Sequence, residues 1–139
     1  MSTAKWSPPG SAPHGEDHHR ILEVVDEYVA GFEQADPERL QRVMHPQCRL
    51  TASFDGRLVV HTRDEFIAAV SGRRSTVAGT APGEGAARVL LASVGTPTTA
   101  IVRVQDADAD TTYVDELQLV RLDAGWTIIA KSWHPEPRR

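Results

Sequence analysis

The residues best suited to chemistry lie in one strand-like segment near the end of the sequence, residues 111–122. Side chains alternate across a strand, so Tyr113, Asp115, Leu117 and Leu119 share one side of this segment. That side combines an apolar surface with one ionisable carboxyl group beside an aromatic hydroxyl. A carboxyl group on an apolar face is penalised unless it is paired or used, so Asp115 is the first candidate for acid–base chemistry.

The residue opposite Asp115 depends on the turn that follows the segment. Residues 126–132 form a second strand-like run, and residues 123–125 connect the two runs into a β-hairpin. A two-residue turn places His134 opposite Asp115 as a possible dyad, whereas a three-residue loop places Trp133 there as an aromatic wall. We favour Trp133, because a glycine after a type I turn is common in three-residue hairpins.

Histidines and the single cysteine are weaker candidates. His45 precedes Pro46 where a helix is expected to end, so its imidazole is expected to cap terminal carbonyls. If His45 points inward, it is an acid/base candidate near neutral pH. Cys48 falls within an apolar alternation, which indicates a buried residue and not a nucleophile. No metal site is predicted from the histidines near the N-terminus, which lie in or beside an expected tail: His14, His18 and His19.

Hydrophobic periodicity supplies the elements that position these side chains. Apolar residues recur at helical spacing from Glu16 to about Gln34, and Asp36-Pro37 indicates the start of a short second helix. A third helix begins at residue 62. Strands are expected at residues 48–54, 58–61, 87–94, 98–105, 111–122 and 126–132, with an Asp55-Gly56 turn, a loop at 71–85 and an Asp-rich turn at 106–110.

The order α-α-β-β-α-β-β-β-β predicts an α+β fold in which consecutive strands pair antiparallel and the helices gather on one face. A strongly curved sheet wrapped over helices leaves a cavity of the kind that binds small ligands. We predict a disordered N-terminal tail at residues 1–15 and a single domain at 16–139. Arg73 and Arg74 open the long loop and could clamp an anionic ligand at the pocket.

Bulk properties exclude several classes of protein. With 139 residues, 40% hydrophobic and 24% charged, the chain fits one soluble domain. No apolar run reaches the roughly 18 to 20 residues of a membrane span, and no signal-peptide pattern is present, so a cytoplasmic location is expected. The net charge is −4 and acidic and basic residues are interspersed, so the sequence predicts no basic patch that would bind nucleic acid.

Two stretches of the sequence carry a family resemblance, YVAGFEQADPERLQRVMHPQCRL and VDELQLVRLDAGWTIIAK. In their order and spacing they resemble the nuclear transport factor 2-like (NTF2-like) superfamily, over roughly residues 18–134. Within it the chain is most similar to the SnoaL-like and lumazine-binding-like branch. The resemblance implies a cone-shaped fold, with three helices packed on a strongly curved, mainly antiparallel six-stranded sheet. It also implies an internal pocket and a homodimer.

The resemblance also suggests roles for two residues. Compared with the ketosteroid isomerase type of that superfamily, Tyr28 falls at the oxyanion-hole tyrosine and Asp115 at its partner carboxyl group. The general-base position holds Ala52 here, so His45, Asp55 or His61 would have to supply a base. The alternative is structural: Tyr28 packs in the helix core, while Asp115 satisfies a turn or pairs with Arg103 or Arg121. The sequence leaves both interpretations open.

We therefore expect a small-molecule pocket protein, acting as a cofactor-free isomerase, dehydratase or cyclase on a small apolar or carbonyl-containing compound. The alternative is a non-catalytic ligand-binding or homodimeric interaction domain. No Gly-rich dinucleotide loop or flavin signature is present, so no cofactor is expected. The catalytic candidates are Asp115, Tyr28 and His45, and the ligand-binding candidates are Tyr113, Leu117, Trp133, His61 and Phe54. The outer side of the last strands, with Val114, Glu116, Gln118 and Val120, is expected to form the homodimer interface.

Overall fold

The protein is described by a computed structural model that covers residues 14–72, 87–107 and 110–137. The elements occur in the predicted order. The helices are α1 (His14–Glu33), α2 (Pro37–Val43) and α3 (Arg63–Gly72). The strands are β1 (Met44–Phe54), β2 (Arg57–Thr62), β3 (Arg88–Val94), β4 (Thr99–Ala107), β5 (Thr111–Leu122) and β6 (Gly125–Pro137).

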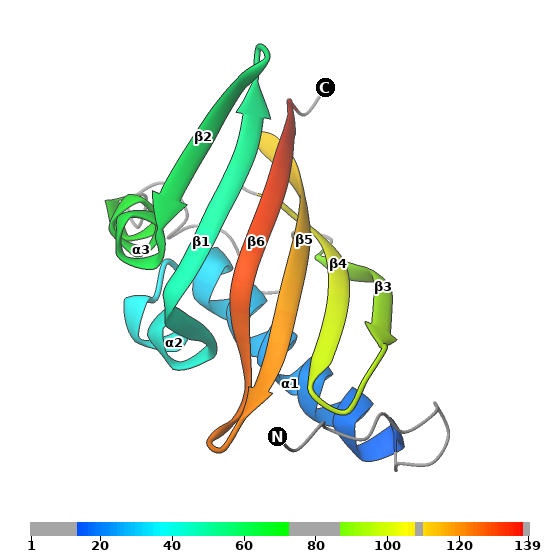
Figure 1. The fold of residues 1–139 in the computed structure, drawn as a ribbon. Coiled ribbons are helices and arrows are strands. Elements are labelled where there is room, and N and C mark those ends of the chain that lie inside the picture. The colour runs from blue at the N-terminus through cyan, green and yellow to red at the C-terminus, as the bar shows by residue number, and fades with distance from the viewer. Residues whose placement is uncertain (1–13, 73–86, 108–109, 138–139) are drawn as a thin grey trace, which may run out of the picture.

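The six strands form one curved sheet in the order β2-β1-β6-β5-β4-β3 (Figure 1). Neighbouring strands pair antiparallel except β1 and β6, which run parallel in the middle of the sheet. The helices lie against one side: α1 crosses behind β3 to β6, and α3 packs beside β1 and β2 (Figure 1). The predicted α+β class and the mainly antiparallel sheet are confirmed.

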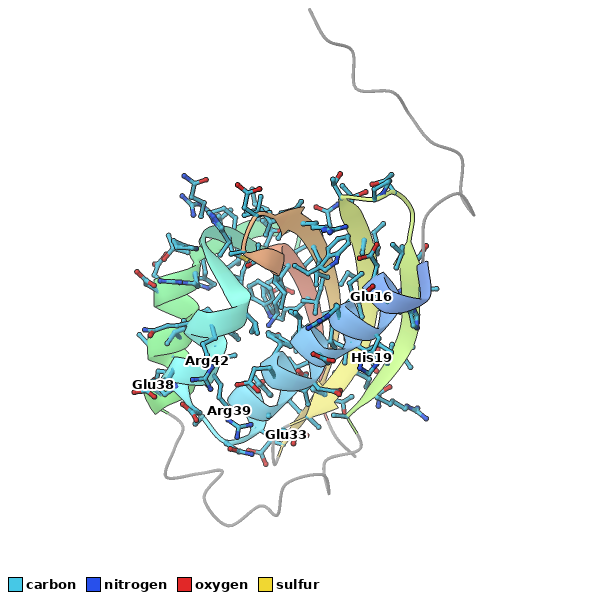
Figure 2. The ribbon with its side chains drawn as sticks, turned by 90° about the horizontal axis from the view of Figure 1, so that it is seen from below. Glu16, His19, Glu33, Glu38, Arg39 and Arg42 are labelled. Carbon is cyan, nitrogen blue, oxygen red and sulfur yellow. The ribbon has the colours of Figure 1, made fainter. Side chains whose placement is uncertain are left out.

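The core forms where the apolar face of α1 meets the concave side of the sheet. Ile21, Val25, Tyr28 and Phe32 recur every three or four residues along α1 and are all buried. Alternate residues of each strand face them, and in β4 the buried set is Ala100, Val102, Val104 and Asp106. Charged side chains of α1 and α2 lie on the outer surface of the helices, among them Glu16, His19, Glu38 and Arg42 (Figure 2).

Two of the connections, the start of α2 and the turn between β1 and β2, form as the local sequence predicted. The Asp36 carboxylate accepts hydrogen bonds from the backbone N–H groups of Glu38 and Arg39, which caps α2. Asp55 and Gly56 adopt positive φ angles of 51° and 77°, the conformation of a tight hairpin turn between β1 and β2. Both predictions are confirmed by the structure.

Several boundaries differ from the prediction. Helix α1 begins two residues earlier, at His14, and β1 begins at Met44, where the sequence indicated the end of a helix. Strand β4 continues through Asp106 to Ala107, so the first two residues of the expected turn at 106–110 belong to a strand. The rest of the predicted tail, and Arg73 and Arg74, lie outside the described residues. Among the described helices, none is long and apolar enough to cross a membrane.

Candidate functional site

A cavity of about 240 Å³ opens between α1, α3 and the concave side of the sheet. Its walls are mostly apolar, and the aromatic residues among them are Phe32, Phe66, Tyr113 and Trp133. Leu50, Ala69 and Val70 complete the apolar lining. The polar lining residues are His61, Glu65, Asp106, Asp115 and Lys131. An apolar cavity with a few converging polar groups is the usual form of a small-molecule site.

Asp115 lies at the buried end of this cavity and is only 1% exposed. Its Oδ2 accepts a hydrogen bond of 2.7 Å from the hydroxyl of Tyr28, which comes from α1. The same oxygen lies 3.6 Å from the ammonium nitrogen of Lys131 on β6. Asp115 is therefore held by one hydrogen bond and one ion pair at the same oxygen, while its Oδ1 has no hydrogen-bond partner among the described residues.

Lys131 is a buried cation, with a side chain only 5% exposed. Its Nζ lies 4.2 Å from the centre of the Phe66 ring, 5.3 Å from that of Tyr28 and 5.8 Å from that of Trp133. These rings supply cation–π attraction in addition to the ion pair with Asp115. The ammonium group is thereby fixed between the helices and the sheet.

Asp106 places a second carboxyl group at the same end of the cavity. It is fully buried, and neither of its oxygens has a hydrogen-bond partner among the described residues. Burial raises the pKa of Asp106 well above its ordinary value, and the neighbouring charge of Asp115 raises it further. Asp106 therefore keeps its proton to a higher pH than an ordinary carboxyl group does, beside Asp115, which accepts a hydrogen bond.

Tyr28 acts on Asp115 and not directly on the cavity. Burial first, and then the charges of Asp115 and Asp106, raise the pKa of the Tyr28 phenol well above its ordinary value. The phenol keeps its proton and donates it to the Asp115 carboxylate. An oxyanion hole would need that proton to point at the ligand, so these contacts make Tyr28 a positioning group for Asp115.

A β-bulge decides which residue faces Asp115. The hairpin turn contains only two residues, because Leu122 pairs with Gly125. A register shift after Gln118 adds one residue to β6, and this shift pairs Asp115 with Trp133. The expected neighbour is confirmed, but the expected three-residue loop is wrong. The same bulge turns Lys131 toward the cavity, opposite Leu117.

The other predicted site residues divide into two groups. Tyr113, His61 and Trp133 line the cavity with Asp115, and the His61 and Trp133 rings stack with centres 5.9 Å apart. Leu117 is fully buried in the core, and Phe54 is 38% exposed and meets the edge of the Trp133 ring. Neither of these two is among the described residues that line the cavity.

His45 lies away from the cavity, at the start of β1. Its Nδ1 accepts a hydrogen bond of 3.0 Å from the backbone N–H of Gln47, so the expected capping of helix carbonyls is not seen among the described contacts. Of the three groups considered as a base, only His61 lines the cavity. The arginines considered as partners of Asp115 pair elsewhere: Arg103 with Glu116, and Arg121 with Asp17.

Cys48 is buried, as predicted. Burial raises the pKa of its thiol to about 11, so the thiol is protonated at neutral pH and is not a nucleophile.

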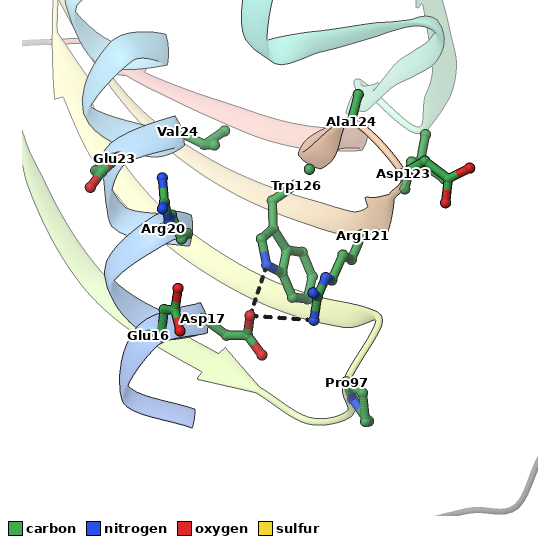
Figure 3. Close-up of a pocket in the computed structure, with 12 residues that line it drawn as sticks. Glu16, Asp17, Arg20, Glu23, Val24, Pro97, Arg121, Asp123, Ala124 and Trp126 are labelled. Carbon is green, nitrogen blue, oxygen red and sulfur yellow. Dashed lines mark hydrogen bonds and ion pairs between the residues drawn. The ribbon is translucent and has the colours of Figure 1, made fainter. Parts of the chain in front are cut away.

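A larger hollow of about 750 Å³ lies between the first turns of α1 and the β5–β6 hairpin (Figure 3). Its central carboxylate, Asp17, already accepts from the Trp126 indole N–H at 3.4 Å and lies 3.7 Å from Arg121. Because these groups are paired with one another, this hollow is a weaker candidate than the smaller cavity.

The fold and the cavity together define an NTF2-like protein, and comparison with known proteins gives the family. A family profile described as "Putative lumazine-binding" matches residues 16–134, so the chain belongs to that family. No curated protein matches the chain in sequence.

Solved structures show the same fold at low sequence identity. An NTF-2 like protein of unknown function from Silicibacter pomeroyi is 21% identical, with a TM-score of 0.76 over 90% of this chain and 100% of its own. An NTF2-like protein of unknown function from Shewanella baltica is 19% identical, with a TM-score of 0.78 over 92% and 100%. A ketosteroid isomerase-like protein from Erwinia carotovora atroseptica is 16% identical, with a TM-score of 0.64 over 86% and 96%.

Proposed function

We propose that this chain binds a small apolar or carbonyl-containing compound in the cavity and catalyses a proton transfer on it without a cofactor, as in isomerisation, dehydration or cyclisation. The observation that carries the proposal is the pair of buried carboxyl groups, Asp106 and Asp115, at the end of a mostly apolar cavity. Two carboxyl groups whose surroundings separate their proton affinities can divide the roles of acid and base.

The roles follow from the contacts of each group. Asp115 Oδ1 has no partner among the described residues and accepts a proton from a carbon next to the ligand's carbonyl group. Asp106 donates its own proton to the carbonyl oxygen, which completes an enol. Where that enol is conjugated with a C=C bond, Asp115 returns its proton to the far carbon while Asp106 takes back the proton of the enol oxygen, which gives the isomeric ketone and restores both carboxyl groups. Tyr28 and Lys131 hold the other oxygen of Asp115 and thereby fix its direction.

The alternative is a non-catalytic ligand-binding domain, as the family description also implies. It is favoured by the fact that Asp115 already has a hydrogen bond and an ion pair, which a purely structural carboxylate would also have. In that case the aromatic walls bind the compound and the carboxyl groups only orient it.

Exchange of the α-protons of cyclohexanone into D₂O, followed by proton NMR, separates the two functions. If the cavity catalyses proton transfer, wild-type protein should accelerate exchange over buffer by roughly 10²-fold or more, and Asp115→Asn should remove the acceleration. Asp123→Asn is the matched control, because it makes the same change in an exposed carboxyl group, in the turn between β5 and β6 and outside the cavity lining. Binding of cyclohexanone without faster exchange would leave only the binding function.

We also propose a homodimer formed through the outer face of the sheet. Apolar side chains are exposed there on strands of both halves, including Ile101 at 48% and Val60 at 50%. Ile101 pairs with Gln118, which is part of the predicted interface. We expect Ile101→Glu to convert a dimer to a monomer in size-exclusion chromatography with light scattering. Gln34→Glu, exposed just after α1 on the helix side of the sheet, is the control, and a monomeric wild-type protein would refute the proposal.

A further inference from the structure

Three buried oxygen atoms at the end of the cavity have no hydrogen-bond donor among the described residues. They are both side-chain oxygens of Asp106 and the Oδ1 of Asp115. A buried polar atom without a partner is destabilising, so buried polar groups in native proteins are nearly always satisfied. A proton held by Asp106 can serve one of these oxygens, but once both carboxyl groups are ionised every donor must come from the cavity that they line.

Acidic side chains also outnumber basic ones among the described residues that line the cavity. Glu65, Asp106 and Asp115 line the cavity, whereas Lys131 is the sole lysine or arginine among its described lining residues. Glu33 of α1 adds a further acidic group beside Asp106, and its buried Oε1 is likewise without a partner among the described residues.

The lysine lies on the far side of Asp115 from Asp106. Strand order places Lys131 on β6, Asp115 on β5 and Asp106 on β4, so Asp115 is the middle member of the row. Its Oδ2 faces Lys131 and Tyr28, which leaves Oδ1 and Asp106 without a cation of their own. A second positive charge between the two carboxyl groups would continue an alternating series of charges.

Aromatic rings adjoin the same point. Asp106 pairs across the strands with Tyr113, and the Tyr113 ring meets Phe32 edge to face, with ring centres 5.7 Å apart. Carboxylates beside aromatic rings are the surroundings that suit an organic ammonium ion, because the ring faces and the anions both attract it.

We propose that the cavity binds a small ring-bearing primary amine in its ammonium form, with the ammonium group between Asp106 and Asp115 and the ring against Phe32 and Tyr113. The inference rests on the binding part of the proposed function, because it names a ligand class for the same cavity. An ammonium ion that occupies Asp115 Oδ1 and ionises Asp106 belongs to the ligand-binding alternative and not to the proton transfer. The amine donates up to three hydrogen bonds, which matches the three oxygen atoms that have no donor.

Binding of an ammonium ion has a further consequence for Asp106. The ion stabilises the charged carboxylate, so the acid proton of Asp106 leaves when the amine enters. The titratable or charged groups that face this carboxyl group are Tyr28 and Glu33 from α1, Asp115 and Tyr113 from β5, and Lys131 from β6. His61 of β2 and Glu65 of α3 line the rest of the cavity.

Calorimetric titration with benzylamine and with benzyl alcohol tests the proposal, because the two probes have nearly the same size and differ in charge. At pH 7 benzylamine should bind at least about tenfold more tightly than benzyl alcohol. Titrations in two buffers of different ionisation enthalpy should show release of up to about one proton with the amine and none with the alcohol. Asp106→Asn should remove the preference for the amine, and Asp123→Asn, in the exposed turn between β5 and β6, should retain it.

Each other outcome has a defined meaning. Equal affinity for the two probes would overturn the amine assignment and leave the pocket function in place. A preference for the amine that survives in Asp106→Asn would overturn the placement of the ammonium group at Asp106. If neither probe binds, the small-molecule function of the cavity fails, and the amine assignment fails with it.

Discussion

Replacing Lys131 with methionine should lower the free energy of unfolding by about 3–5 kcal/mol, the loss expected when one partner of a buried ion pair is removed. Methionine keeps most of the aliphatic length of the side chain but has no charge. Asp115 would then keep the Tyr28 hydroxyl as its only donor in the described part of the chain. Chemical denaturation at pH 7, followed by circular dichroism, measures the loss.

Two controls separate the ion pair from the general effect of a substitution. The double variant Lys131→Met with Asp115→Asn should recover part of the loss, because it removes both charges and reports their coupling in a double-mutant cycle. Arg103→Met breaks an exposed pair with Glu116 and should lower stability by no more than about 1 kcal/mol. If Lys131→Met were no more destabilising than Arg103→Met, the buried pair would have no important part in the fold.

Strong local patterns predicted much of this structure. The spacing of Ile21, Val25 and Tyr28 defined the buried face of α1, and the Asp55-Gly56 pair defined the first hairpin. The alternation along β5 placed Asp115 on the inner face. These features depend on residues that are close together in the sequence, so they can be predicted from the sequence alone.

Asp106 was missed because its surroundings in sequence suggest a turn. Residues 106–110 alternate between aspartate and alanine, which is typical of a solvated connection. A usable signal was nevertheless present, since the alternation Ala100, Val102, Val104 continues to Asp106 if the strand is extended by one more pair.

Lys131 was missed for a different reason. Strict alternation from the buried Ile128 keeps residue 130 inside and turns Lys131 outward, and only the bulge in β6 reverses this. The position of a bulge depends on the pairing with the neighbouring strand, so it cannot be predicted from the sequence of β6 alone.

These two missed residues change the chemistry of the site. Asp115 alone, beside Tyr28, suggested two donors directed at a developing oxyanion. With Lys131 and Asp106 on either side, Asp115 is an acceptor in a buried row of ionisable groups, one ammonium and two carboxyl groups, that runs across β6, β5 and β4. Such a row stabilises the fold only when each of its polar groups has a hydrogen-bond partner. A ligand that supplied donors to Asp106 would therefore add the most to its stability.

Asp106→Asn should stabilise the protein by an amount that grows as the pH rises. The pKa of Asp106 is raised in the folded state, so the folded chain holds a proton that the unfolded chain releases above the ordinary carboxyl pKa of 3.8. The stability of the wild type therefore falls as the pH rises from that value toward the raised pKa, by up to about 1.4 kcal/mol per pH unit. Asparagine resembles the neutral acid in shape and has no proton to lose, so the variant lacks this decline.

Calorimetric melting temperatures at pH 4, 6 and 8 measure the effect, at roughly 3 °C for each kcal/mol. The variant and the wild type should melt close together at pH 4 and separate progressively above it, with the variant higher. Asp123→Asn, in the exposed turn between β5 and β6, should follow the wild type at every pH, because solvent already surrounds that carboxyl group. A constant difference between Asp106→Asn and the wild type across this range would mean that Asp106 holds no extra proton. The acid of the proposed proton transfer would then have to be a different group.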